Sequence, residues 1–457
     1  MDSRIIPRGD GEFFCRNLSN RHKWQEKNYC FAKLYISNIK HILCLKHIMH
    51  SGDIFYLGMN LLLDMGGMIL RRKVTTWILL GLFLGLVSHS CTADILPGSD
   101  LAGPTPAPAV AENQTVSLTA VGDLVMHLPI INSCFQANDN TYDFRPVFSE
   151  IKPELERADF TVAVLEAPLA GPESTYTGYP SFNCPGAIAE ALQWSGVDLV
   201  FLANNHCLDR GVAGLQKTMA YLDQIGLAHT GCNAAPAQKR YRMAEIRGVK
   251  LAFLSYTTST NGIRLPAGKE WMVNMFDYAR IAADIADARK NGADGIVFAL
   301  HTGIEYQRYP SKEQQEMVQH LLALGVDVIL GSHVHVIQPL ELRTIFIPAT
   351  QTTKNCFIAY SLGNFLSNQR WRYSDCGLIV HLNAEKPSPK TAITITNENH
   401  RPIWVNRFTK EGKLHYRIKL VNQNEQTADA DLDAEDRARM AQVWEETAAL
   451  MDEWNME

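Results

Sequence analysis

The stretch of this chain that decides its fold is a turn at the end of a strand, Leu330-Gly331-Ser332-His333-Val334-His335. The preceding residues 326–330 are mostly apolar, which predicts a buried strand. Glycine and serine then free the backbone to bend, so that the two imidazoles can converge on one point. Imidazole is the commonest metal ligand near neutral pH. For these two residues alone, a hydrogen-bonded histidine pair at a strand end is the alternative.

Four other apolar runs also end in polar residues of the metal-ligand type. These runs are residues 116–121, 160–165, 197–202 and 296–300. The polar residues that follow them are Asp123, Glu166, Asn205, His206, Asp209 and His301. Carboxylate, amide and imidazole groups together suit Mn, Fe or Zn better than Ca or Mg, and no set of cysteines matches a structural zinc site. The sequence therefore predicts one shared polar site at several strand ends.

Segments with helical spacing of apolar side chains separate these runs. They are residues 212–225, 278–290 and 313–324. Strands that alternate with helices predict an α/β fold, whose ligands gather beyond the carboxyl ends of the strands.

The C-terminal part of the chain predicts further strands and a helix. The strands are expected at residues 377–383, 392–396 and 414–421, and an amphipathic helix is expected at residues 433–451. We expect residues 384–457 to pack on the main domain, residues 116–383.

Composition excludes some functions and leaves the cysteine chemistry open. The 457 residues are 46% hydrophobic, which is enough for a large folded domain. A net charge of -5 gives no general basic field, so we expect no nucleic-acid partner. The cysteines of the body are Cys134, Cys184, Cys207, Cys232, Cys356 and Cys376. Export permits disulfides between them, but a chain of this size does not need them, and Cys207 beside His206 is equally a candidate free thiol.

The N-terminal part changes character at Met68. Residues 1–67 show no sustained period, and we interpret them as a non-native upstream extension, with a cytoplasmic segment as the alternative. Residues 68–91 have the basic, apolar and small-residue order of a secretory signal peptide. Their apolar run is shorter than the about 20 residues of a spanning helix, which makes a permanent anchor the weaker alternative.

Cys91 stands at the expected cleavage site and resembles the lipid-modified first residue of bacterial lipoproteins. Ser88 departs from that signal, because it stands where Leu or a similar residue is usual. Residues 92–115 are rich in proline and alanine and predict a semi-extended linker. We therefore expect an exported protein at the cell envelope, either anchored to the membrane as a lipoprotein or secreted.

Six motifs in the body, in the same order, resemble those of the CapA family, the poly-gamma-glutamate capsule synthesis proteins. They are Gly122-Asp123, Leu165-Glu166-Ala167-Pro168, Asn204-Asn205-His206 with Asp209 and Gly211, His301-Thr302-Gly303-Ile304-Glu305-Tyr306, Gly331-Ser332-His333-Val334-His335, and Tyr360-Ser361-Leu362-Gly363-Asn364-Phe365. The resemblance covers roughly residues 118–365. It implies the fold of the calcineurin-like metallophosphoesterases, a four-layer α/β/β/α sandwich.

The same resemblance implies a site for two divalent metal ions, Mn, Fe or Zn. Its ligands would be Asp123, Glu166, Asn205, His301, His333 and His335, with Glu166 in the bridging place. His206 and Asp209 would be catalytic, with His206 as the acid, and Glu305 and Asn364 would bind substrate.

Two departures from the family of phosphatases bear on the metal spacing. His127 lies two residues beyond the place of the histidine in an Asp-x-His motif. Glu166 is one methylene longer than the aspartate that usually bridges the metals.

Two functions follow as hypotheses. The first is an exported metal-dependent hydrolase, acting on a phosphoester, as the fold implies, or on a gamma-glutamyl polymer, as the family name implies. The second is a non-catalytic envelope or capsule assembly protein that binds an anionic polymer. Local basic groups for such a polymer would be Arg308, Lys312, Arg370 and Arg372, unless these form only a solvated charged face. The ligand set favours the hydrolase, because a binding module does not need an acid beside a metal.

Overall fold

The computed structural model describes residues 114–347, 351–388, 391–422 and 431–456. They belong to one compact unit, Pro106–Glu457. The expected signal peptide, Cys91 and nearly all of the expected linker lie outside the described residues. Among the described helices, none is long and apolar enough to cross a membrane.

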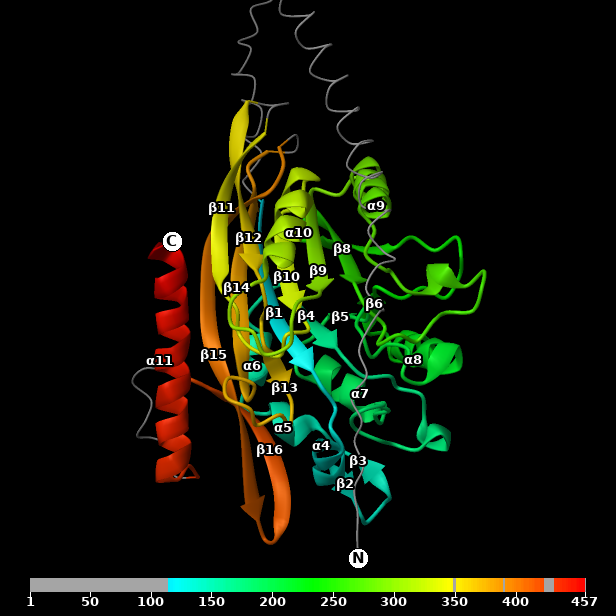
Figure 1. Ribbon diagram of the computed structural model, residues 1–457, viewed down its shortest axis with the longest axis vertical. Coiled ribbons are helices and arrows are strands. Elements are labelled where there is room, and N and C mark those ends of the chain that lie inside the picture. Colours follow the sequence, from blue (N-terminus) through cyan, green and yellow to red (C-terminus); the bar gives the residue numbers. More distant parts are fainter. Residues whose placement is uncertain (1–113, 348–350, 389–390, 423–430, 457) are drawn as a thin grey trace, which may run out of the picture. The chain divides into compact units, whose positions relative to one another are not determined.

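The larger of two central sheets contains eight strands (Figure 1). They are β1 (Gln114–Leu124), β4 (Phe160–Leu165), β5 (Leu199–Phe201), β6 (Ala228–Thr230), β13 (Asn364–Leu366), β14 (Cys376–Lys386), β15 (Thr394–Lys410) and β16 (Lys413–Leu420). Their order is β16-β15-β14-β1-β4-β5-β6, and β13 pairs with β1. Strands β1, β4, β5 and β6 are parallel, so their carboxyl ends lie at one edge.

The second sheet contains six strands. They are β7 (Tyr241–Ile246), β8 (Val249–Thr257), β9 (Gly295–His301), β10 (Val328–Ser332), β11 (Leu340–Ile347) and β12 (Thr352–Ala359).

 The order of the strands in this sheet is β11-β12-β10-β9-β8-β7. The four central strands, β12, β10, β9 and β8, run parallel to one another. The edge strands β7 and β11 are antiparallel to their neighbours.

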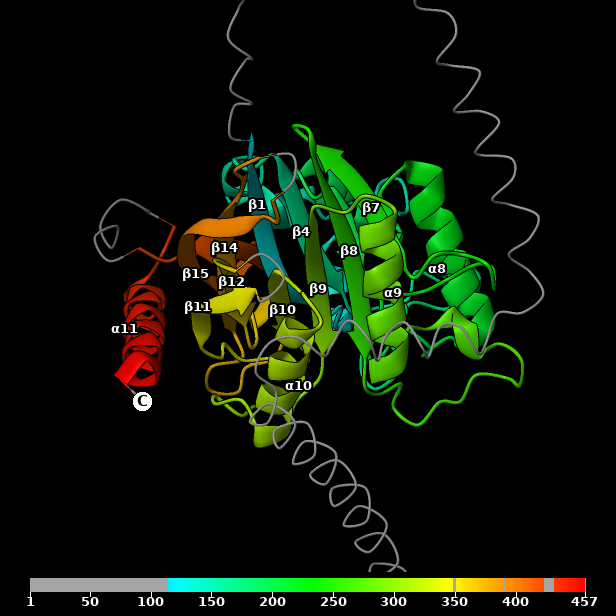
Figure 2. The ribbon, with the colours of Figure 1, turned by 90° about the horizontal axis from the view of Figure 1, so that it is seen from above.

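Helices cover the outer faces of both sheets. They are α4 (Leu128–Ser133), α5 (Arg145–Phe148), α6 (Lys152–Leu155), α7 (Ala187–Trp194), α8 (Gly211–Ile225), α9 (Tyr278–Lys290) and α10 (Lys312–Ala323). The last helix, α11 (Ala434–Met456), packs instead at the side of the two sheets, on the core between them. Figure 2 shows α9 and α10 against the second sheet. Helix α8 packs through Leu215, Met219 and Leu222 on the outer core of the first sheet. The capping box of Ser311 and Gln314 begins α10, which fixes how the chain enters this helix.

Three hydrophobic cores separate four layers. On β9, Val297 and Ala299 face the core between the two sheets, whereas Phe298 and Leu300 face the core that α9 and α10 cover. On β4, alternate residues face the core between the sheets and the core beneath α4 to α8. This alternation follows from the period of two in a strand that is buried on both faces. The predicted four-layer α/β/β/α sandwich is confirmed.

The C-terminal strands continue the first sheet. Strand β14 passes through residue 383, where the sequence predicted the end of the main domain, and pairs with both β1 and β15. Helix α11 packs through Val443, Leu450 and Met451 on the core between the sheets. The predicted terminal helix is therefore present, and its apolar side chains are core contacts.

Several strands differ from the sequence prediction. No strand was predicted at β7, β11 or β12, and the strand predicted at residues 392–396 is the beginning of β15, which is 17 residues long. Polar residues and Pro402 interrupt the apolar pattern of β15. Its pairing with β14 on one side and β16 on the other holds it extended nevertheless.

Candidate metal centre

Strand ends from both sheets bring the predicted ligands together. Asp123 lies near the end of β1, Glu166 follows β4 directly, and His301 is the last residue of β9. Strand β1 and the segment before β13 approach so closely that a Cβ on Gly122 would lie 2.0 Å from the carbonyl oxygen of Gly363. Only glycine fits at this position, and the close approach places Asp123 beside the second sheet's strand ends.

Ligand-type atoms of these residues form two groups that share one member. Atoms of Asp123, Glu166 and His335 lie within 4.8 Å of one another, and so do atoms of Glu166, His301 and His333. Glu166 Oε1 lies 3.6 Å from Nε2 of His301 and 3.9 Å from Nε2 of His335. Glu166, to which the family resemblance gives the bridging place, is therefore the residue that both groups contain.

Buried polar atoms in both groups lack hydrogen-bond partners. They are Oδ1 of Asp123, both carboxylate oxygens of Glu166 and Nδ1 of His333. Leaving such atoms unsatisfied costs about 1–3 kcal/mol each, and more for charged groups. Divalent cations bound by these oxygen and nitrogen atoms would remove that cost, so the residues fit divalent metal ions.

Burial sets the protonation of the site. It raises the pKa of Glu166 to about 8, and the charge of Asp123 adds to that effect. Burial also lowers the pKa of His301 and of His333 to about 3, which leaves both imidazoles neutral, the form that binds metal.

The carboxylates reverse the effect of burial at His335. Burial lowers its pKa, but the charges of Glu166 and Asp123 outweigh burial and raise the pKa to about 9. Burial raises the pKa of Asp123, but the hydrogen bond and the charge of His335 outweigh burial and lower the pKa below its usual value. The site without a cation thus holds an ion pair of Asp123 and His335.

Further contacts orient the histidines. Ser332 Oγ hydrogen-bonds Nδ1 of His301 at 2.8 Å, and Asn205 Oδ1 accepts a hydrogen bond from Nε2 of the same ring at 2.9 Å. Nδ1 of His335 donates to Oδ1 of Asn364 at 3.2 Å. Such contacts fix the ring orientation of metal-binding histidines. Sequence reasoning did not assign Ser332 this role, although its place directly before His333 was a usable signal.

Two of the predicted ligands have strained backbones. His333 has φ of 95° and His335 has φ of 60°, in the left-handed region that favours glycine. Such conformations cost about 1–3 kcal/mol each for other residues. The buried Val334 between them and the hydrogen bond from the His333 amide to Asp123 hold the turn in this form.

His206 and Asp209 form a pair beside the two groups. Nδ1 of His206 donates to Oδ2 of Asp209 at 2.8 Å, and that oxygen also accepts from the amide of Phe182 at 2.7 Å. The ring of Phe182 meets the imidazole of His206 edge-on, with centroids 4.6 Å apart. The carboxylate therefore fixes the ring and leaves Nε2 as the atom that can exchange a proton with a ligand.

A cleft of about 700 Å³ opens onto the site. His206 and His335 line it, and the predicted substrate-binding residue Glu305 lies in its wall. Asn364, the other predicted substrate-binding residue, is fully buried behind His335 and does not line this cleft. The substrate contact of Asn364 stays a prediction.

His127 lines the cleft and belongs to neither ligand group. Its ring meets that of Phe182 edge-on, with centroids 5.5 Å apart, and its Nδ1 accepts from the amide of Asn368 at 3.3 Å. Burial lowers the pKa of this imidazole to about 4. His127, which stands two residues beyond the histidine position of an Asp-x-His motif, thus lies in the cleft wall.

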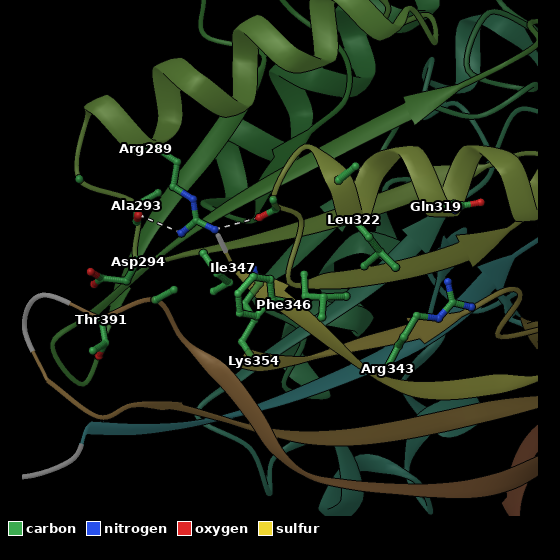
Figure 3. A pocket seen from close by; sticks show the side chains of 15 residues that line it. Arg289, Ala293, Asp294, Gln319, Leu322, Arg343, Phe346, Ile347, Lys354 and Thr391 are labelled. Carbon is green, nitrogen blue, oxygen red and sulfur yellow. Dashed lines mark hydrogen bonds between the residues drawn. The ribbon is translucent and has the colours of Figure 1, made fainter. Parts of the chain in front are cut away.

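A second cavity, of about 820 Å³, lies away from these residues (Figure 3). No ligand of either group is among the described residues that line it. Two cations of its wall, Arg289 and Lys354, are paired with the buried Asp327. This cavity therefore has no part in the metal centre.

All six cysteines of the described residues are free and buried. Cys207 follows His206 but is absent from both ligand groups. Burial raises the pKa of Cys134 and Cys376 to about 12, which keeps these thiols protonated and unreactive.

The four-layer sandwich and its ligand cluster define a protein of the metallophosphoesterase-like class. Within that class, the chain belongs to the family of the bacterial capsule synthesis protein PGA_cap, whose sequence profile matches residues 117–369. The family resemblance that the motifs indicated is confirmed.

Two curated relatives carry capsule names. The capsule biosynthesis protein CapA of Bacillus anthracis is 25% identical over 326 residues, which cover 66% of this chain and 76% of the relative. The PGA biosynthesis protein CapA of Bacillus subtilis (strain 168) is 24% identical over 292 residues, which cover 61% of this chain and 70% of the relative.

Two solved structures are also similar. The NAD nucleotidase NadN of Haemophilus influenzae matches with a TM-score of 0.40 and 13% identity, over 73% of this chain and 63% of that one. The calcineurin-like phosphoesterase YfkN of Bacillus subtilis matches with a TM-score of 0.35 and 14% identity, over 64% of this chain and 90% of that one.

Proposed function

We propose that this chain is a metal-dependent hydrolase of capsule or envelope metabolism, acting on a phosphoester or on a gamma-glutamyl polymer. One observation carries the proposal. Asp123, Glu166 and His333 hold buried ligand atoms without partners, and the cleft above them is lined by His206, an imidazole fixed for proton transfer. A protein that only binds a polymer has no need of this combination.

Asp123, Glu166 and His335 would hold one divalent ion, and Glu166, His301 and His333 would hold the other. Asn205, whose amide oxygen lies beside His301, would complete the second set. The two ions would supply Lewis-acid chemistry, which polarises the bond to be cleaved and neutralises developing charge.

The protein's own groups would orient the ligand and move a proton. Asp209 fixes Nδ1 of His206, so that Nε2 would give a proton to the leaving atom of the substrate. Asn364 and Ser332 would keep His335 and His301 in the orientation that binding requires. Phe182 packs on His206 and keeps water from one side of its ring.

The names of the relatives support a role at the capsule, and the fold supports phosphoester chemistry. Fold alone does not decide between these substrates. Metal analysis of the purified body, combined with hydrolysis assays on phosphoesters and gamma-linked glutamate polymers, tests the proposal. A folded protein that takes up no transition metal on titration would refute the hydrolase and favour the binding protein.

Export to the cell envelope is a second part of the proposal. It rests on the basic and apolar order of residues 68–91 and on the proline-rich linker that follows them. Cys91→Ala should release the protein from the membrane fraction if this cysteine carries a lipid, and deletion of residues 1–67 should leave export intact. Unchanged fractionation of the Cys91 variant would refute the lipid anchor.

A further inference from the structure

Two arginines lie side by side in the wall of the cleft that opens onto the metal centre. Arg370 follows β13, and its Nη1 donates to the carbonyl oxygen of Val405 at 2.8 Å. Arg407, two residues further along β15, lines the same cleft. Burial and the charge of Arg407 lower the pKa of Arg370. The fold thus holds two like charges close together, although this placement costs energy.

The donors of Arg370 are not satisfied within the described structure. Its Nε and Nη2 atoms are buried and have no hydrogen-bond partner. Arg407 donates a long hydrogen bond of 3.5 Å to Oδ1 of the neutral Asn368, and its guanidinium also hydrogen-bonds the hydroxyl of Tyr416. No carboxylate of the described residues lies within ion-pair distance of either guanidinium.

The other three basic residues singled out in the sequence have different surroundings. Arg372 pairs with Glu446 at 3.2 Å, and Lys312 lies 3.9 Å from Glu316. Arg308 donates to the carbonyl oxygen of Glu446 and stacks on the ring of Tyr373. None of these three lines the cleft. Arg308 also has a buried Nε without a hydrogen-bond partner among the described residues, so Arg370 and Arg407 are set apart by their place in the wall of the cleft.

An anion in the cleft beside the two guanidinium groups would offset the repulsion between their charges. Guanidinium groups bind carboxylate and phosphate oxygens in a bidentate manner. His206 and His335 line the same cleft, so a ligand that fills it reaches from the arginines to the metal centre. We propose that Arg370 and Arg407 form an anion subsite, which binds a second carboxylate or phosphate of a substrate whose reacting group lies at the metal centre. This inference rests on the proposed function and adds a substrate class, molecules with repeated anionic groups.

The rest of the cleft wall suits such a ligand. Trp371 is 65% exposed and Tyr179 is 75% exposed, and both line the cleft. These rings offer apolar surface to the uncharged backbone of a polymer. Glu305 adds the one negative charge in the described lining, which disfavours an anion at its position and favours the arginines instead.

Binding to metal-depleted full-length protein tests the subsite apart from hydrolysis. The two probes are an oligomer of gamma-linked glutamate and inorganic tripolyphosphate, measured by calorimetry at fixed salt. Arg407→Gln changes an exposed side chain, and Arg370→Gln removes the unpartnered donors. Each should weaken binding of the preferred probe by about tenfold, because each change removes a positive charge that attracts the anion.

Arg372→Gln is the matched control, because Arg372 is an exposed arginine that is paired outside the cleft. Its affinity should equal that of the parent. Binding of either probe that depends on Arg407 supports the subsite, and the tighter probe shows whether carboxylate or phosphate is the source of the anion. Absence of binding by both probes, or an equal loss in the Arg372 control, overturns the proposal. Because these binding measurements use metal-depleted protein, their result does not depend on whether the protein takes up metal or hydrolyses a substrate.

Discussion

The main-chain amide of His333 donates a hydrogen bond to Oδ2 of Asp123 across 3.1 Å, although 210 positions separate the two residues in the sequence. The bond joins the end of β1 in the first sheet to the turn after β10 in the second. The ligand cluster is therefore complete only when the two sheets pack on each other. The core between the sheets, with residues such as Val297 and Leu330, holds the metal ligands in place.

Glu166→Gln should lower metal content more than any other single ligand change. Glu166 belongs to both ligand groups, whereas His301 and His335 belong to one group each. We expect about two ions per chain in the parent, about one in His301→Ala or His335→Ala, and close to none in Glu166→Gln. Mass spectrometry of the metals in the purified proteins measures these values. His127→Ala, which changes a cleft residue outside both groups, should keep the content of the parent. Full metal content in Glu166→Gln would show that this residue does not bridge.

His333→Gly and His333→Ala should differ in stability while both lose metal. The φ of 95° at this position suits glycine and strains alanine as much as histidine. In metal-free protein, the glycine variant should be more stable than the alanine variant by about 1–2 kcal/mol. Urea unfolding of the two variants measures the difference. Equal stability would mean that the unfolded chain's gain in freedom with glycine cancels the relief of strain.

The candidate ligand residues were predictable because each lies at the end of a strand that is buried on both faces. Asp123, Glu166 and His301 are polar residues at the ends of apolar runs, and such residues must face a site or a partner. The alternation of apolar side chains between two cores was also readable once strands and helices were placed in order. Apolar patterns in a sequence indicate which residues are buried. Both the candidate metal centre and the strands of the sandwich are buried, so both could be predicted from such patterns.

The other wall of the cleft was not predictable, because it depends on pairing between distant strands. Arg407 lies on β15, where polar residues and Pro402 conceal the strand, and its place in the cleft follows from the register of β15 on β14 and β16. Strand β11 alternates between partly exposed and exposed residues after the buried Leu340, and this period of two was a recoverable signal. Arg370 was noticed as a basic residue, but its unsatisfied donors are visible only in the folded chain.

His206→Ala should keep the metal and lose turnover. Its ring belongs to neither ligand group, and its Nε2 is the candidate proton donor. If His206 is a general acid, kcat should fall by about 10²- to 10⁴-fold with unchanged metal content. Asp209→Asn should reduce kcat as well, because an amide can hold the imidazole in the wrong tautomer. Equal turnover in the His206 variant and the parent would assign the proton transfer to another group.

Asp327→Asn should destabilise the protein without changing its metal content. The carboxylate of Asp327 is fully buried, pairs with Lys354 and Arg289, and accepts from the amide of Ile296 at 2.7 Å. Without it, the ammonium of Lys354, whose side chain is only 7% exposed, has lost its buried counter-charge. Removing one partner of such a pair costs about 3–5 kcal/mol, and chemical denaturation measures this loss.

The double variant Asp327→Asn with Lys354→Met distinguishes this cause from a general defect of packing. Methionine fills a volume similar to that of lysine and needs no counter-charge, so the double variant should recover much of the stability lost in Asp327→Asn. Arg289→Gln should cost less than the change at Asp327, because the Arg289 side chain is 29% exposed and water can solvate what remains. A double variant as unstable as Asp327→Asn would show that the hydrogen bond to Ile296, and not the unpaired charge of Lys354, accounts for the loss.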